Sequence, residues 1–337
     1  MFRRVVNIER VRAGPASMLA DDDPISHALE SRAILVSVVD SNNIEGIFTS
    51  EERAVALIAG NVAPRGHDEK EIAGYRDALR YIHREHDSIR FDRESILEIY
   101  SILMSYRGDD VEPVFRKVEN VIVDRDSDGN IVNMYPTVPA SEVEYCIDQM
   151  VGAFWEVRYD DDVNDLLLIP CVIMDFLRIH PFKDGNGRMS RLLTTLLMYQ
   201  SGYDVCRYVS MESKINSSKM DYYHALEESQ IGWFDNSCDY TPFITYFLSQ
   251  LFLCYRDLNR LVGENMGGSR KSDALESFLR ICTVHVSKSD LCAMFPNISE
   301  ITVSRVLRRM CDSGELRKVG GGRSTRYISS KMDGGRS

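Results

Sequence analysis

The segment His180–Arg191, HPFKDGNGRMSR, brings together within twelve residues the side chains that phosphate chemistry requires. The glycines on either side of Asn186 allow a turn with positive φ and a close approach of the backbone to a ligand. A helix that starts at this turn points its first N–H groups into it, and such a helix N-terminus binds anions. Arg188 and Arg191 lie three residues apart, on one face of that helix. The segment therefore predicts a cradle for a polyphosphate.

Two titratable side chains flank the same turn. Asp184 is a candidate Mg²⁺ ligand, because Mg²⁺ is often held by one carboxylate together with phosphate oxygens. His180 is a candidate general base, because the pKa of histidine lies near neutrality. Each fragment alone would be an ordinary turn or loop, but their combination favours phosphoryl or nucleotidyl transfer. The segment lacks the lysine and the Ser/Thr of a P-loop.

Apolar helices are expected on both sides of the segment. Val163–Ile179 predicts a strongly apolar helix, with Pro170 either in its first turn or at a kink. Gly187–Ser201 predicts the next helix, and Gly202 ends it. The apolar face of this second helix is made of leucines: Leu192, Leu193, Leu196 and Leu197.

Most of the remaining chain is also expected to be helical. The predicted helices are His27–Asp40, Ser50–Gly60 opened by a Thr49–Glu52 capping box, Glu69–Arg84, Asp92 to about Tyr106, Ser141–Tyr159, Tyr222–Gln230 and Pro242–Leu261. In Val118–Tyr135 the period changes, and two β-rich runs flank Ser127-Asp128-Gly129-Asn130. This pattern predicts a β-hairpin.

A flexible joint is expected at Gly263, Gly267, Gly268 and Ser269, and a small domain follows it. Its predicted elements are helix Ser272–Val284, a helix capped by Ser287 that ends at Phe295, helix Glu300–Asp312 capped by Ser299 and ended by Gly314, and strands Leu316–Val319 and Ser324–Ile328. A helix, a helix-turn-helix and a β-wing in this order resemble a winged-helix domain.

Charge is distributed unevenly along the chain. The net charge of the 337 residues is −11, which argues against a protein that coats nucleic acid or anionic membrane as a whole. Ile301–Arg326 nevertheless carries seven basic and two acidic residues, so this segment is +5 and the rest of the chain is −16. This basic segment makes DNA binding a candidate role for the C-terminal domain. Protein docking and dimerisation remain alternatives.

The composition places the protein among globular cytoplasmic proteins. No signal peptide follows the basic N-terminus, and no run reaches the roughly 18 apolar residues of a membrane span, so no membrane partner is expected. The eight cysteines form no CxxC pair, which favours buried thiols in a reducing compartment over disulfides or zinc.

The segment His180–Arg191 matches HxFx[D/E]GNGRxxR at every fixed position and so resembles the motif of the Fic (filamentation induced by cAMP) family. The resemblance extends over about Ala33–Leu261. It implies a mainly α fold, a Fic-type helical bundle with a β-hairpin flap, followed by the small winged-helix domain. The implied domains are an N-terminal helical region 1–110 with an inhibitory motif 41–46, a Fic core 111–262 with flap 118–135 and motif 180–191, and a winged helix 270–330.

The family resemblance implies a role for each motif residue. His180 would deprotonate a Ser, Thr or Tyr hydroxyl of a target protein for in-line attack on the α-phosphate of ATP. Asp184 would hold Mg²⁺ or Mn²⁺ between the α- and β-phosphates. Gly185, Asn186 and Gly187 would bind phosphate oxygens through their backbone, and the Asn186 side chain would help at the α-phosphate. Arg188 would bind the β-phosphate and Arg191 the γ-phosphate. Phe182 is expected to anchor the loop in the core.

A second motif implies that the reaction is restrained. Ser41–Gly46 fits the family's inhibitory pattern [ST]xxxE[GN], and its place before the Fic core implies an N-terminal inhibitory helix. By resemblance Glu45 pairs with Arg191 in place of the γ-phosphate, neutralises the arginine and repels the incoming nucleotide. Ser41 would serve helix geometry. Some relatives with this glutamate also remove AMP, so de-AMPylation is a secondary expectation.

The remaining expectations concern the partners of the core. The hairpin Val118–Tyr135 matches the family's flap, which would hold an extended target segment by β-augmentation. Tyr223 would stack on adenine, and Gln230 would hydrogen-bond it. Homodimerisation is a further expectation from the family. Two alternatives to AMP transfer remain: a DNA-binding regulator with a nucleotide-sensing core, and transfer of another phosphate-linked group.

Overall fold

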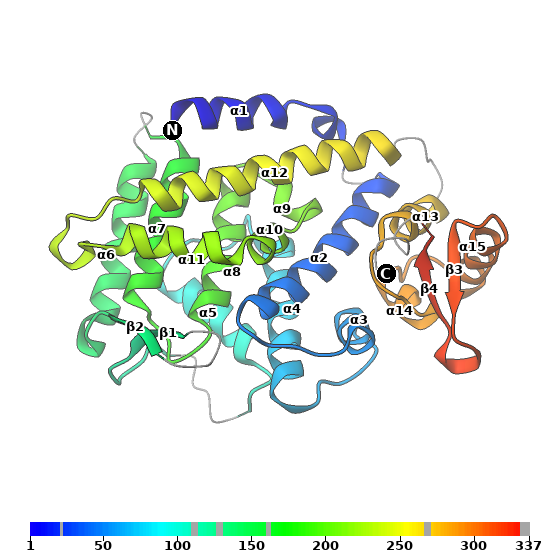
Figure 1. The fold of residues 1–337 in the computed structure, drawn as a ribbon, viewed down its shortest axis with the longest axis horizontal. Coiled ribbons are helices and arrows are strands. Elements are labelled where there is room, and N and C mark those ends of the chain that lie inside the picture. The colour runs from blue at the N-terminus through cyan, green and yellow to red at the C-terminus, as the bar shows by residue number, and fades with distance from the viewer. Residues whose placement is uncertain (21–22, 109–113, 126–130, 160–162, 266–270, 331–337) are drawn as a thin grey trace. The chain divides into compact units, whose positions relative to one another are not determined.

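The structure is a computed structural model that describes residues 1–20, 23–108, 114–125, 131–159, 163–265 and 271–330 (Figure 1). Its described part is mainly helical, with two separate two-stranded antiparallel sheets, which confirms the predicted fold class. None of the helices in these ranges has the length and apolar character needed to cross a membrane. Contacts divide the chain into two compact units, and the helices α4 (Gly66–Glu85) and α12 (Thr241–Asn265) contribute residues to both.

The first unit contains Met1 and residues 77–203 and 218–249. Its elements are α5 (Arg93–Met104), β1 (Val121–Arg125), β2 (Ile131–Pro136), α6 (Val143–Arg158), α7 (Asp165–Ile179), α8 (Asn186–Gln200), α11 (Lys219–Gln230) and the 3₁₀ turns Ala140–Glu142 and Trp233–Asp235. α7 packs against α6, α8 and α11, and α5 packs against α8. The predicted leucine face of α8 is fully buried, so α8 is the central helix of this unit.

The second unit contains residues 2–76, 204–217 and the chain from Gln250 onward. Its elements are α1 (Phe2–Arg12), the 3₁₀ turns Pro15–Met18 and Gly322–Ser324, α2 (Pro24–Ile44), α3 (Glu51–Ala59), α9 (Val205–Tyr208), α10 (Met211–Ser217), α13 (Lys271–Ile281), α14 (Lys288–Met294), α15 (Glu300–Asp312), β3 (Leu316–Val319) and β4 (Arg326–Ser329). α2 packs against α9, α10 and α13, and α3 packs against α14 (Figure 1).

The hairpin prediction is confirmed. β1 pairs antiparallel with β2, with Ile122 opposite Tyr135 and Val123 opposite Met134. The predicted turn residues Ser127–Asn130 lie outside the described residues. The hairpin therefore stands in the expected part of the chain, and α6 separates it from the two helices that flank the motif.

Two predicted helix starts are wrong. Ser50, and not Thr49, is the N-cap of α3, since its side chain accepts a hydrogen bond from Arg53 N. Thr49 Oγ1 instead donates to Glu69 Oε1 at 3.3 Å. Ser141 does not cap α6, because the chain passes through the 3₁₀ turn Ala140–Glu142 before the helix starts at Val143.

Two further details of the helices concern Pro170 and Gly263. Pro170 lies inside α7, beyond its first turn, because the helix starts at Asp165 after the Asn164 cap, and this excludes the first of its two predicted places. Gly263 does not mark a joint but lies within α12, whose apolar face continues through Leu261 and Val262. The other predicted joint residues, Gly267, Gly268 and Ser269, lie outside the described residues.

The C-terminal elements follow the predicted order. Ser287 and Asp290 form a capping box at α14, and Ser299 caps α15 as expected. β3 pairs with β4, and an isolated bridge joins Val286 to Tyr327. These elements pack on the N-terminal part of the same unit, where Arg32 Nε donates to Ile281 O at 3.1 Å. The winged-helix assignment and the division at 110, 262 and 270 stay predictions.

Candidate active site

The loop between α7 and α8 has a backbone that the two flanking helices fix at both ends. His180 ends α7 in the left-handed region, with φ 52° and ψ 59°, and its N–H donates to Phe176 O at 3.0 Å. Gly185 begins α8 with φ 82°. A Cβ at Gly185 would lie 2.5 Å from Met104 Cε, the movable end of a flexible side chain, so it is the left-handed conformation that requires glycine there.

The middle of the loop is anchored by Phe182, as the sequence predicted. Its side chain is fully buried and stacks on the Tyr100 ring, with 3.6 Å between ring centroids. The Asn186 side chain accepts from Phe182 N at 3.0 Å and donates to Phe182 O at 2.8 Å. Both polar atoms of the Asn186 side chain therefore hold the loop, which leaves the backbone of α8 as the group facing an anion.

The N-terminus of α8 has the properties of an anion site. Gly185 is its N-cap and supplies no side-chain hydrogen bond to the first turn. Arg188 and Arg191 follow in this helix, and their side chains are 1% and 4% exposed. Burial removes most of the water from a guanidinium and strengthens its attraction to an anion. Two cations and a helix dipole at one loop are features that favour an anion. The phosphate roles of Arg188 and Arg191 stay predictions.

The His180 side chain is oriented by its own helix. Its Nδ1 lies 3.3 Å from Leu177 O, and a carbonyl oxygen can only accept a hydrogen bond. The contact therefore favours the tautomer with the proton on Nδ1 and the lone pair on Nε2. This is the arrangement that a general base requires, because Nε2 can then take a proton.

Asp184 is a carboxylate held by two arginines. Arg107 Nη2 donates to its Oδ2 at 2.6 Å, and Arg188 Nη2 lies 3.9 Å from Oδ1. Burial raises the pKa of Asp184, but the charges of Arg188 and Arg107 and the hydrogen bonds from Arg107 and Gly185 N leave that pKa below its usual value. The Asp184 side chain is 54% exposed. An ionised, accessible carboxylate suits Mg²⁺ or Mn²⁺.

A divalent cation at this loop needs further ligands from a bound nucleotide. Among the described residues no group of three or more His, Cys, Asp or Glu side chains could hold a metal. Mg²⁺ is commonly bound by one carboxylate together with phosphate oxygens and water. Asp184 beside a phosphate cradle fits that pattern.

The predicted adenine-side residues lie on α11. Gln230 Oε1 accepts from Arg178 Nη1 at 2.7 Å, so this amide already has a protein partner. The Tyr223 side chain is 42% exposed, and Lys219 Nζ lies 5.9 Å from its ring centre. α11 also contacts the hairpin, because Tyr135 OH donates to Glu227 Oε1 at 2.7 Å. The adenine roles of Tyr223 and Gln230 stay predictions.

The predicted inhibitory residues lie at the end of α2, in the second unit. Ser41 is fully buried within the helix. Glu45 is the C-cap residue with an exposed side chain, and its N–H donates to Asn42 O at 3.0 Å. Gly46 has φ 77° and turns the chain out of the helix. The role of Glu45 stays a prediction.

Two arginines of the site were missed by the sequence analysis. Arg107 contacts the candidate metal ligand, and Arg116 Nε donates to His180 O at 2.8 Å. Arg107 follows the end of α5, and Arg116 precedes β1, so neither belongs to a recognisable motif. Arg116 is followed by a second basic residue, Lys117, between Phe115 and Val118, and this pattern does not single it out.

Comparison with known proteins identifies the same region. The family model described as Fic/DOC family matches residues 90–198. A Caenorhabditis elegans protein named protein adenylyltransferase fic-1 is 29% identical over 219 residues, which are 60% of this chain and 37% of the relative. A Nematostella vectensis protein named protein adenylyltransferase Fic is 23% identical over 68% of this chain and 49% of the relative. The chain thus spans between a third and a half of the length of these relatives.

Solved structures show the same fold. A Fic family protein from Desulfovibrio desulfuricans G20 aligns over 100% of this chain and 96% of its own, with a TM-score of 0.64 and 20% identity. Fic-1 from C. elegans aligns over 76% of this chain and 71% of its own, with a TM-score of 0.56 and 21% identity.

Proposed function

We propose, from the match of residues 90–198 to the Fic/DOC family model, that the protein is a protein adenylyltransferase that moves AMP from ATP to a hydroxyl of a target protein and of itself. The observation that carries the proposal is the α7–α8 loop. It combines an oriented histidine, an accessible carboxylate and two buried arginines around the N-terminus of α8.

The chemistry follows from these residues. The target oxygen forms a bond to the α-phosphorus while the bond from that phosphorus to the bridging oxygen of pyrophosphate breaks. His180 Nε2 takes the proton of the attacking hydroxyl. Arg188 and Arg191 neutralise the charge that develops on the leaving pyrophosphate. A Mg²⁺ or Mn²⁺ ion held by Asp184 supplies additional charge neutralisation at the phosphates when bound.

We propose that Glu45 restrains this reaction. The proposal is supported by the pattern Ser41–Gly46 and by the place of Glu45 at a helix end, where the turn at Gly46 fixes the backbone. A carboxylate that takes the place of a phosphate on Arg191 would lower the affinity for ATP. The resting protein is then expected to be nearly inactive, and Glu45→Gly is expected to release it.

We propose that the target docks on the flap hairpin, defined as β1 and β2. Each of these strands has one strand neighbour in the described residues, so an extended peptide can pair with the other edge. The side chains of Val121 and Met134 are 43% and 58% exposed on the hairpin. Backbone pairing would present a target hydroxyl with little dependence on its neighbouring side chains.

The test of the transfer activity compares three proteins incubated with ATP and Mg²⁺ by intact-mass spectrometry. Glu45→Gly should gain the mass of AMP on itself faster than wild type, and Glu45→Gly with His180→Ala should gain none. Equal labelling of Glu45→Gly and wild type would contradict the inhibitory role of Glu45. Unchanged labelling after His180→Ala would contradict the assignment of His180 as the general base.

A second candidate function, DNA binding, is favoured by the exposed cations of the C-terminal elements. Arg305 and Arg308 are exposed three residues apart on α15, beside Ile301, which is 82% exposed. Within the described residues neither arginine forms an ion pair. Arg317 and Lys318 are exposed on β3. We propose that this cationic face binds duplex DNA, and retention of genomic fragments in a gel-shift assay that weakens with salt is the expected result. Absence of binding at low salt would exclude it.

A further inference from the structure

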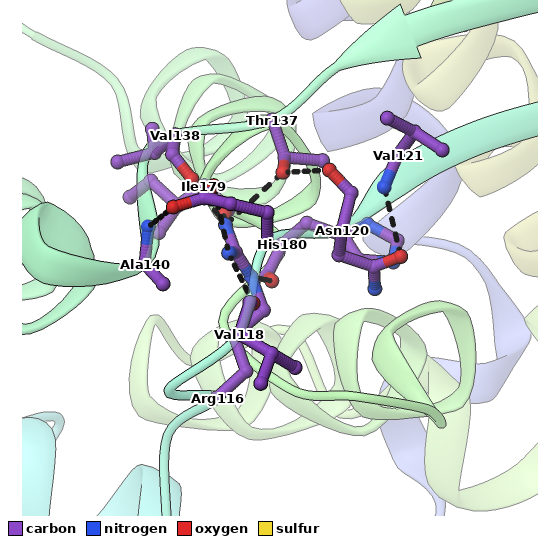
Figure 2. A network of polar contacts seen from close by, with 10 residues as sticks. Arg116, Val118, Asn120, Val121, Thr137, Val138, Ala140, Ile179 and His180 are labelled. Carbon is purple, nitrogen blue, oxygen red and sulfur yellow. Dashed lines mark hydrogen bonds and ion pairs between the residues drawn. The ribbon is translucent and has the colours of Figure 1, made fainter.

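We propose that Arg116 is a positioning residue that fixes the catalytic base His180 and joins it to the flap hairpin. The proposal rests on the proposed adenylyl transfer, in which His180 is the base and the hairpin receives the target. The proposal is argued from the hydrogen bonds of the buried Arg116 guanidinium, which Figure 2 shows.

Arg116 binds three consecutive carbonyl groups at the end of α7. Its backbone N–H donates to Pro181 O at 2.9 Å, Nε donates to His180 O at 2.8 Å, and Nη2 donates to Ile179 O at 3.3 Å. His180 is a non-glycine residue at φ 52°, a conformation that costs free energy and persists only where neighbouring contacts hold it. Arg116 supplies those contacts on the carbonyl side of His180.

The same guanidinium binds both ends of the hairpin. Nη1 donates to Val118 O at 3.1 Å, before β1, and Nη2 donates to Thr137 Oγ1 at 3.1 Å and to Val138 O, after β2 (Figure 2). Thr137 Oγ1 in turn donates to Asn120 O at 2.7 Å and so closes the base of the hairpin. The start of β1 and the end of β2 are therefore both held by the guanidinium that holds His180.

The electrostatics explain why an arginine stands here. The Arg116 residue is 5% exposed, and among the described residues its carboxylate contact is Glu119 Oε2, 4.0 Å away on a side chain that is 74% exposed. The negative charge near the guanidinium comes mainly from carbonyl oxygens, including those at the C-terminal end of the α7 dipole. A planar fork of five N–H donors can bind several carbonyl groups at once, whereas a lysine ammonium cannot match that geometry.

The functional consequence is a mechanical link between docking and catalysis. A target strand added to the hairpin would stiffen β1 and β2, and their ends are bonded to the guanidinium that holds His180. Arg178 adds a second tie, because its Nη2 donates to Pro136 O at 3.0 Å from the last turn of α7. The ATP cradle on α8 is built from other residues. Loss of Arg116 should therefore reduce turnover more than nucleotide binding.

The test uses the full chain in the Glu45→Gly background and compares Arg116→Met, Arg116→Lys and Thr137→Val. Arg116→Met should lower kcat by about 100-fold, the effect of misplacing a reacting group by roughly 1 Å, with KM for ATP nearly unchanged. Arg116→Lys keeps the charge but not the fork, and it should recover only part of kcat. Thr137→Val keeps the arginine and the volume, and it should lower kcat least while hydrogen exchange of the hairpin becomes faster.

Arg158→Met is the matched control, because Arg158 Nη2 likewise donates to a helix-terminal carbonyl, Gln200 O at the end of α8, at 2.6 Å. It should lower the melting temperature without changing the kcat of the folded protein. Equal kcat for Arg116→Met and Arg158→Met after correction for folded fraction would overturn the proposal, as would full activity of Arg116→Lys. If Arg116→Met does not fold, Thr137→Val decides, and unchanged kcat together with unchanged hairpin exchange would overturn the proposal.

Failure of the Arg116 proposal can be distinguished from failure of the proposed AMP transfer. If Glu45→Gly with native Arg116 transfers no AMP, the transfer proposal fails. Hydrogen exchange alone then tests whether Arg116 connects the hairpin to His180. Arg116→Met should accelerate exchange both in the hairpin and at residues 176–183, while Arg158→Met should leave exchange in both segments unchanged. Faster exchange in only one of the two segments would overturn it.

Discussion

Arginine side chains occupy opposite environments in two regions of the molecule. Around the motif loop and the hairpin base, four arginines are at most 5% exposed: Arg116, Arg178, Arg188 and Arg191. In α15 of the C-terminal elements, three are exposed: Arg305, Arg308 and Arg309. The first set includes donors that are committed to named carbonyl or amide oxygens at distances from 2.7 to 3.3 Å. Arg309 pairs with Glu276 at the surface.

The difference in burial determines which property of arginine matters in each region. A buried guanidinium has lost its hydration, so each of its directed contacts is strong and removal of one partner is costly. An exposed guanidinium keeps its water, and its contribution acts at longer range and is screened by salt. Single substitutions in the motif region are therefore expected to change the turnover number. Substitutions in the C-terminal elements are expected to change salt-dependent binding.

The largest expected effect is that of Arg188→Met in the Glu45→Gly background. Arg188→Met removes a buried cation that lies 3.9 Å from Asp184, so the melting temperature should fall, and the rates are compared for the folded protein. AMP transfer should fall by about 100- to 1,000-fold in kcat/KM, because the leaving phosphates lose a preorganised charge. Calorimetry and initial rates measure the two quantities. A melting temperature that collapses while kcat/KM of the folded protein is kept would show that Arg188 is structural.

A smaller effect is expected for Gly185→Ala, which perturbs the loop that presents the buried arginines. The left-handed backbone costs about 1–2 kcal/mol with a Cβ, and Met104 must also move. Gly60→Ala is the control, since Gly60 has φ 81° but no atom within 4 Å of an added Cβ. Denaturant unfolding should show the greater loss for Gly185→Ala, and that variant alone should weaken ATP binding. Equal losses with unchanged ATP affinity would contradict the close packing of this turn.

The sequence predicted a turn between two apolar helices and the burial of Phe182, because the residues that form this loop are consecutive. Its partners could not be predicted, since Arg107 contacts a residue 77 positions away and Arg116 one 64 positions away, and no local pattern encodes such pairs. The same limit applies to Gln230, whose amide is taken by Arg178, 52 positions away. Helix caps were off by a residue or more where a second hydroxyl or a 3₁₀ turn competed, as at Ser50 and Ser141.

An intermediate case is Arg107, which is 18% exposed and bonded to the half-exposed Asp184. Arg107→Gln should change the free energy of unfolding by less than about 1 kcal/mol, as for other accessible ion pairs. The Mg²⁺ concentration that half-saturates ATP binding should fall, because a competing cation leaves Asp184. Arg93→Gln, which removes the 3.2 Å pair with Asp148 elsewhere in the same unit, is the control and should leave the Mg²⁺ dependence unchanged. A rise in the required Mg²⁺ would mean that Arg107 helps to form the site.

The smallest effect on folding and transfer is expected for Arg305→Gln with Arg308→Gln. Both side chains are exposed, so the melting temperature and the AMP transfer rate should match those of the parent. DNA affinity should fall, and the slope of log affinity against log salt should decrease by about 2, one unit for each lost phosphate contact. Binding measured over a salt series checks this. A large loss of stability would break the contrast between the two regions.

The most direct test of the central claim is which phosphate of ATP is transferred. Glu45→Gly is incubated with Mg²⁺ and ATP labelled at either the α- or the γ-phosphate, with Glu45→Gly plus His180→Ala beside it. For AMP transfer we expect that only the α-label becomes bound to protein and that His180→Ala abolishes this labelling. Protein-bound label from the γ-phosphate without label from the α-phosphate would contradict the account.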